Sequence, residues 1–223
     1  FAWSRVGVFV SHNYPDSGPC VYTRGVVPGL TSGNVLQSFF FAGVRNYYEG
    51  SYGGPWAGVV KTDPDLVWQW EAHIGTVAHV GGASTVARRG SGFLVGGWDA
   101  YSTGEGEFGW LGQFDAEGNL LGDHLDGVGG QAVNGITSTA DGGYLLAKDH
   151  AVTKVDSALT FQWSAGDAAL GEGWNSYQTA KAAPAGDVFG LAHRMHNTPG
   201  VPLNVGSVVT RFASNGDIAW SQF

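Results

Sequence analysis

Short apolar segments alternate with polar turns along the chain, and one arrangement of them recurs four times. Each recurrence contains two short apolar segments joined by a polar turn. These paired segments lie at 59–70, 110–122, 152–163 and 208–220. Runs of alternating apolar and polar residues bounded by turn residues are typical of β-strands. The pattern therefore predicts four β-hairpins.

The four hairpins share residues at fixed positions. A polar anchor precedes each turn, at Lys61, Gln113, Lys154 and Arg211. Three copies have aspartate two residues later, and three have tryptophan seven residues further on. These residues are Asp63, Asp115 and Asp156, followed by Trp70, Trp163 and Trp220. Gly122 replaces the tryptophan in the second copy. The anchors are 41 to 57 residues apart, which is typical of propeller blades.

Further strands are predicted upstream of each hairpin. Apolar segments lie at 38–43, 92–97, 143–147 and 187–192, and segments of small residues lie at 84–87 and 135–139. Four strands in each repeat make up a propeller blade. The sequence therefore predicts an all-β fold, a β-propeller of about four four-stranded blades within one domain, 1–223. The expected repeats are approximately 20–75, 80–127, 130–167 and 172–223, with the outer-strand tryptophans covering the faces between neighbouring blades.

One repeat carries a family resemblance. Residues 140–147 read Ala-Asp-Gly-Gly-Tyr-Leu-Leu-Ala, and they precede Val-Thr-Lys-Val-Asp at 152–156 and a strand containing Trp163. This resembles bacterial-type β-propeller repeats, and the resemblance covers about residues 20–223. It implies a secreted or surface protein, often without known chemistry. We therefore expect an extracellular or cell-surface location, with the periplasm as an alternative.

The first residues resemble a detached outer strand. Phe1-Ala2-Trp3-Ser4 is similar to Ile218-Ala219-Trp220-Ser221, so residues 1–7 are predicted to be an orphan outer strand. Two explanations remain open at this point. The four repeats belong to a larger propeller, which we favour, or the orphan strand pairs with another subunit.

Composition narrows the possible partners. Glycine supplies 37 of the 223 residues, aromatic residues 13% and charged residues only 13%. This excludes a disordered chain and disfavours a helical bundle. The net charge is −8, and Arg88-Arg89 is the longest basic run. Nucleic acid and membrane insertion are therefore not expected. Cys20 is the only cysteine, so no disulfide forms within the chain.

Motifs of known enzymes are missing from the sequence. It has no phosphate-binding loop, zinc-protease helix motif, CxxC pair or GxSxG elbow. His193 and His196 stand three residues apart, but that spacing on a strand does not bring two rings together. We therefore predict a non-enzymatic protein without a cofactor. A quinone-dependent dehydrogenase or a glycosidase is the enzymatic alternative.

One turn has the spacing of a weak calcium site. Asp115, Glu117 and Asn119 offer oxygen atoms at alternate positions, as calcium loops do. The run is too short for an EF-hand. Aspartate and asparagine in tight turns usually bond to their own backbone, so a turn role is the main expectation.

Aromatic residues gather near predicted loops. The candidate binding residues are Tyr47, Tyr48, Tyr52, Trp56, Trp98, Tyr101, Trp174 and Tyr177. Aromatic rings with polar neighbours bind proteins and sugars, but rings also pack between blades. The sequence thus predicts a non-catalytic scaffold or adhesion module that binds other protein chains, copies of itself or a larger extracellular assembly. A carbohydrate-binding propeller is the alternative.

Overall fold

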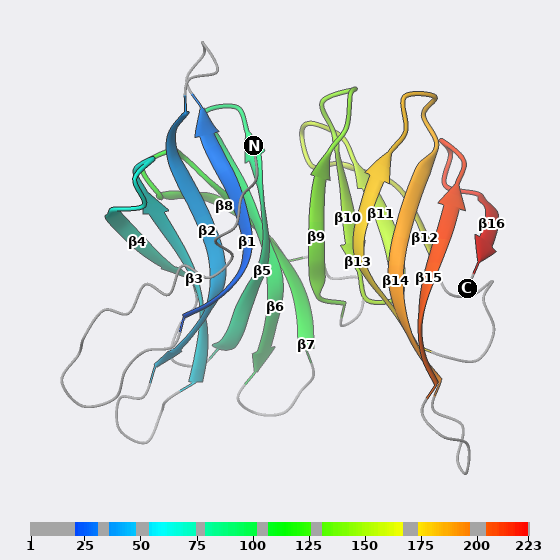
Figure 1. Ribbon diagram of the computed structural model, residues 1–223, viewed down its shortest axis with the longest axis horizontal. Coiled ribbons are helices and arrows are strands. Elements are labelled where there is room, and N and C mark those ends of the chain that lie inside the picture. The colour runs from blue at the N-terminus through cyan, green and yellow to red at the C-terminus, as the bar shows by residue number, and fades with distance from the viewer. Residues whose placement is uncertain are drawn as a thin grey trace. The chain divides into compact units, whose positions relative to one another are not determined.

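The computed structural model describes residues 21–30, 36–47, 54–74, 79–101, 107–125, 131–166, 174–196 and 204–222. Within these ranges every regular element is a β-strand, as Figure 1 shows. The strands form four antiparallel sheets of four strands each. The predicted all-β fold with four-stranded, propeller-like sheets is therefore confirmed. Residues 1–7 and Cys20 lie outside the described residues.

The strands of each sheet follow one another in the chain, so each sheet is a simple meander. The first sheet contains β1 (Val21–Leu30), β2 (Leu36–Tyr47), β3 (Gly54–Thr62) and β4 (Trp68–Ile74). The second contains β5 (His79–Arg89), β6 (Gly92–Tyr101), β7 (Glu107–Phe114) and β8 (Leu120–Leu125). The third contains β9 (Val133–Ser138), β10 (Tyr144–Lys148), β11 (Ala151–Val155) and β12 (Phe161–Gly166). The fourth contains β13 (Trp174–Ala182), β14 (Val188–His196), β15 (Asn204–Phe212) and β16 (Ile218–Gln222).

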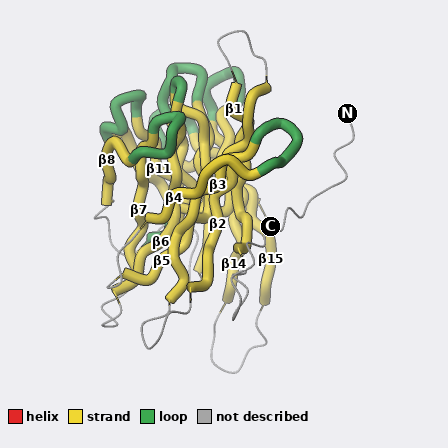
Figure 2. Tube along the Cα trace, turned by 90° about the vertical axis from the view of Figure 1, so that its left-hand side faces the viewer, coloured by secondary structure: helices red, strands yellow, loops and turns green. Residues whose placement is uncertain are grey.

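The repeated aspartate closes the outer hairpin turn, one of the tight loops in Figure 2. The Oδ1 atom of Asp115 accepts hydrogen bonds from the backbone N–H groups of Glu117, at 3.0 Å, and Asn119, at 2.8 Å. Asp63 and Asp156 make the same pair of bonds in their own turns. An aspartate that bonds to its own backbone favours a turn, which explains why the residue recurs.

The chain divides into two compact units, Phe1–Gly130 and Gln131–Phe223. In the first unit, the first and second sheets pack face to face. Phe40 and Val59 of the first sheet meet Phe93 and Phe114 of the second in one buried cluster. The rings of Phe93 and Phe114 stack with their centroids 5.2 Å apart. Apolar burial between the two sheets is thus the main stabilising term.

The second unit repeats this arrangement with the third and fourth sheets. Leu145 and Val152 of the third sheet pack against Tyr177, Val188 and Phe212 of the fourth. All five side chains are buried. The alternation of side chains along a strand directs one face of each sheet into this shared core.

Candidate functional site

Strand pairing shows which positions of the sheets correspond. Residues that pair across neighbouring strands share one face of a sheet. In the third sheet, Leu145 pairs with Lys154, which pairs with Trp163. The same row in the fourth sheet is Phe189, Arg211 and Trp220, and in the first sheet it is Phe40, Lys61 and Trp70. Two residues along the strands, Ala147 and Val152 match Leu191 and Val209, and they match Ala42 and Val59 in the first sheet.

The matching side chains differ sharply in burial. Leu145, Ala147 and Val152 are each 0% exposed, beneath the fourth sheet. Their counterparts Phe189, Leu191 and Val209 are 37%, 41% and 37% exposed, and Trp220, the counterpart of the half-buried Trp163, is 39% exposed. We call these four residues the outward face of the fourth sheet. It is the same face that the first and third sheets bury, left open to solvent.

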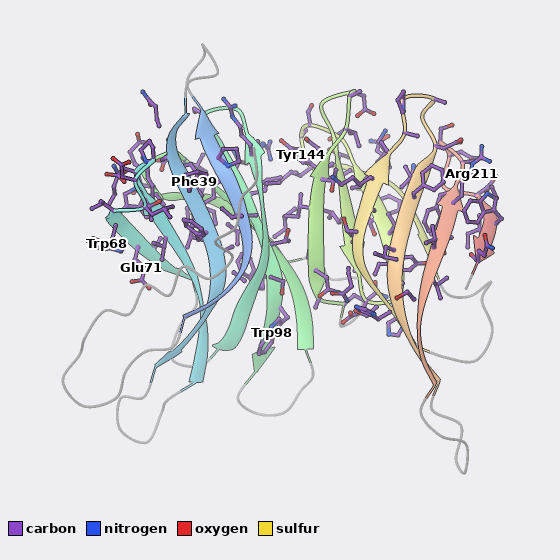
Figure 3. The ribbon with its side chains drawn as sticks, in the orientation of Figure 1. Phe39, Trp68, Glu71, Trp98, Tyr144 and Arg211 are labelled. Atoms are coloured by element: carbon purple, nitrogen blue, oxygen red, sulfur yellow. The ribbon has the colours of Figure 1, made fainter. Side chains whose placement is uncertain are left out.

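Polar groups accompany the outward face. Arg211 lies within it on β15, where Figure 3 labels it. Its Nη2 and Nε atoms donate to Oδ2 of Asp187, at 2.6 and 3.1 Å. The ring of Trp220 meets the ring of Phe189 edge-on, with their centroids 6.1 Å apart. The face therefore combines four apolar side chains with a guanidinium that already has an acidic partner.

Each tryptophan of the buried rows packs on a turn of the next sheet. A Cβ atom added to Gly118 would lie 2.7 Å from the ring of Trp70, and one added to Gly216 would lie 2.8 Å from that of Trp163. The indole N–H of Trp163 donates to the carbonyl oxygen of Ser214, at 3.1 Å. Because the rings lie so close, the two turns require glycine at these positions.

A polar network joins β9 to β13 in the second unit. The Oδ1 atom of Asp149 accepts hydrogen bonds from Nδ2 of Asn134, at 2.9 Å, and from Oγ of Ser176, at 2.7 Å. Gln178 donates to the same serine oxygen, at 2.8 Å. Local sequence patterns do not predict this network, because Asn134, Asp149 and Ser176 are 15 to 42 residues apart. It holds the ends of two neighbouring strands together.

Of the eight aromatic candidates, the structure describes the side chains of two, Trp98 and Tyr177. Trp98 lies on β6, half-buried and labelled in Figure 3, and its carbonyl oxygen accepts the indole N–H of Trp110, at 3.1 Å. The side chains of Tyr47, Trp56, Tyr101 and Trp174 lie outside the described residues, as do Tyr48 and Tyr52. Their predicted binding role stays a prediction.

The position of Tyr177 differs from the one that the sequence predicts. It was expected at a binding loop, but it lies on β13 and is 0% exposed. Its ring centroid lies 6.1 Å from that of Phe212, and its hydroxyl lies 3.4 Å from Oγ1 of Thr210. The prediction of a binding role is wrong for this residue, because strand alternation turns the ring into the core between two sheets.

The weak calcium candidates form a turn. Besides the two backbone bonds, Oδ2 of Asp115 accepts a hydrogen bond from Nδ2 of Asn119, at 2.8 Å. Chiefly because of this side-chain bond, the pKa of the Asp115 carboxyl lies below its ordinary value. Glu117 is exposed. Among the residues that the structure describes, no three His, Cys, Asp or Glu side chains gather as metal ligands would.

The residues of the outward face were missed as a site, although their strands were predicted. Phe189, Leu191 and Val209 follow the same alternation as core residues, so only the sheet packing reveals that they are exposed. In the described part of the chain, no helix is long and apolar enough to cross a membrane.

Comparison with known proteins gives little further help. No family model matches the chain, and no curated protein matches it. Among solved structures, the chain is similar to a protein of unknown function from Bacteroides caccae, with 10% sequence identity and a TM-score of 0.46. The alignment covers 90% of this chain and 81% of that chain.

Proposed function

We propose that this protein is a non-catalytic interaction module, a scaffold or adhesion component, that binds another protein through the outward face of the fourth sheet. The observation that carries the proposal is the difference in burial between matching rows. Leu145 and Val152 are fully buried, whereas Phe189 and Val209 are 37% exposed. The extracellular or cell-surface location expected from the repeat resemblance is part of the proposal.

The exposed area makes such binding energetically reasonable. Full burial of a large apolar side chain contributes about 1.5–3 kcal/mol. Since each of the four side chains is exposed by about two-fifths, covering the face removes a comparable fraction of each from water. Together they supply about 2.5–5 kcal/mol. Clustered apolar exposure of this kind marks interaction sites in soluble proteins.

Site-specific photo-crosslinking tests the proposal. A photoreactive phenylalanine analogue replaces Leu191, at the centre of the face, and the variant is produced in the protein's native host. Phe161 is the matched control position, because it is 60% exposed, more than Leu191, yet lies on the third sheet. We expect a discrete crosslinked protein species from position 191 and none from position 161.

Two results would count against the proposal. The first is the absence of any crosslinked species from position 191. The second is the same set of species from both positions, which would show general stickiness of exposed apolar residues and not a binding face.

A further inference from the structure

Trp220 gives the outward face a recognisable kind of partner. In each unit, the outer-strand tryptophan of one sheet lies on the turn glycine of the next sheet, Trp70 on Gly118 and Trp163 on Gly216. Both glycines have a positive φ, 89° and 93°. Trp220 occupies the same place in its row and is 39% exposed.

The outer turns of the first and third sheets have a different residue at this position. The position of Gly118 and Gly216 is taken by Leu66 in the first sheet and Leu159 in the third, at φ 66° and 65°. Leucine at a positive φ is uncommon and costs conformational energy. The turn keeps its left-handed backbone in all four sheets, so the backbone alone does not select glycine. Among the four described outer turns, both that have glycine lie beneath a tryptophan ring.

We infer that the outward face binds a four-stranded antiparallel sheet of a partner protein, built like β5–β8 and β13–β16, whose outer turn presents glycine to Trp220. This inference rests on the proposed function and names the partner's structural class. The first and third sheets bury this face beneath a sheet of the stated kind.

The first sheet of a second copy of this chain is a poor fit. Its outer turn has Leu66 where Trp220 needs glycine, and that side chain would occupy the space of the ring. The other outer-turn glycines of the described residues, Gly118 and Gly216, already lie beneath Trp70 and Trp163. Neither unit of a second copy therefore offers an uncovered glycine turn among its described residues, and we assign the sheet to a different protein.

The sequence also contains the opposite combination, a glycine on the outer strand and a leucine at the turn position. Gly122 stands in the second sheet where the other three sheets have tryptophan. The sheet that follows it in the chain has Leu159 at the turn position. A leucine turn should fit the outward face once Trp220 is reduced to glycine, because the ring that the leucine side chain would meet is then absent.

A tandem extension of the full chain tests the inference. A second copy of residues 167–223 with a C-terminal tag is added after Phe223, so that its Gly216 turn is offered to Trp220. Trypsin cleavage at Lys181, Arg194 or Arg211 of the added copy releases the tag. The release rate reports how well the added sheet is docked and folded.

Three variants of the extended chain give the decisive comparison. Gly216→Leu in the added copy should speed tag release at least about tenfold, because the leucine meets the Trp220 ring. Adding Trp220→Gly to that variant should restore most of the protection. Trp220→Gly with the glycine turn retained is the control, and it should release the tag faster than the compensated pair.

The failure of this inference differs from the failure of the proposed function. Rapid tag release from every extended chain, or no rescue by Trp220→Gly, would overturn the sheet partner while a crosslink at position 191 could still stand. Sedimentation velocity of the unextended chain adds a further check. Reversible self-association that Trp220→Ala abolishes would make a second copy the occupant and would also overturn the inference.

Discussion

At the scale of single residues, glycine and tryptophan act as matched pairs. Gly118 and Gly142 both have a positive φ, of 89° and 81°. They differ in what a side chain would meet. A Cβ on Gly118 would lie 2.7 Å from the Trp70 ring, whereas the nearest atom for Gly142 is Cβ of Ser157 at 3.9 Å. Comparing substitutions at these two glycines therefore separates the effect of steric conflict from that of backbone strain.

Gly118→Ala should destabilise the protein more than Gly142→Ala. Backbone strain at positive φ costs about 1 kcal/mol in both variants. The Trp70 ring adds about 1–3 kcal/mol to the first. Urea denaturation of both variants measures the difference, and equal losses would show that Trp70 does not cover the turn.

The two tryptophans Trp163 and Trp220 form a second matched pair. Trp163 is half-buried against Phe212 and Gly216, so Trp163→Ala should lower the free energy of unfolding by about 2–4 kcal/mol. Trp220→Ala should cost about 1 kcal/mol or less, because its ring is more exposed. Denaturant titrations followed by circular dichroism check both values. A loss from Trp220→Ala that equals the loss from Trp163→Ala would contradict the exposed state of Trp220.

Asp141 gives a prediction about pH. Its carboxylate accepts hydrogen bonds from the Lys154 ammonium, the Thr139 hydroxyl and the Gly143 N–H. Chiefly through Lys154, these hold the pKa of the carboxyl well below its ordinary value of 3.8. A lowered pKa in the folded state stabilises the protein above the unfolded pKa, and this contribution is lost as the pH falls towards the folded value.

Asp141→Asn should therefore lower the free energy of unfolding near pH 7 by about 0.5–1 kcal/mol, a small value because the Asp141 side chain is 56% exposed. The difference from the wild-type protein should shrink as the pH falls below about 4. Unfolding titrations at pH 7, 4 and 2.5 measure it. A difference that stays constant over this range would rule out the carboxylate as its source.

At the scale of elements, the sequence predicts the strands well because each hairpin carries its own local signals. The turn aspartates Asp63, Asp115 and Asp156 bond to their own turns, and the alternation of side chains fixes the faces. Which side chains are buried depends on the neighbouring elements. Tyr177 looked like a loop aromatic because its near neighbours are glycine and polar residues, yet β13 buries it.

The outward face could not be predicted for a related reason. Phe189, Leu191 and Val209 alternate along their strands just as Leu145, Ala147 and Val152 do. Residues with the same alternation are buried where another sheet covers them and exposed where none does. The alternation along a strand does not show which of the two applies. The polar network of Asn134, Asp149 and Ser176 also depends on packing, because it joins strands distant in sequence.

Alanine substitutions in matching rows test this reading of the sheets. Leu145→Ala should lower the free energy of unfolding by about 2–5 kcal/mol, because the side chain is fully buried. Phe189→Ala, at the matching position of the fourth sheet, should cost only about 1 kcal/mol. Thermal and urea unfolding of the two variants provide the comparison, and similar losses would mean that the fourth sheet is covered.

At the scale of the whole molecule, the repeats do more than supply stability. In each unit, both sheets bury one face in a shared core. The corresponding apolar face of the fourth sheet, which includes Trp220, stays exposed. This is the face that we propose as the binding surface.

Hydroxyl-radical footprinting of the purified chain tests the central claim most directly, since it reports the solvent access of each side chain. We expect rapid oxidation of Phe189, Leu191 and Trp220. Leu145 and Phe93 should be oxidised little, because the fourth sheet covers Leu145 and the first sheet covers Phe93. Oxidation of the three outward residues as slow as that of Leu145 would show that the face is already covered within the protein, and it would contradict the account.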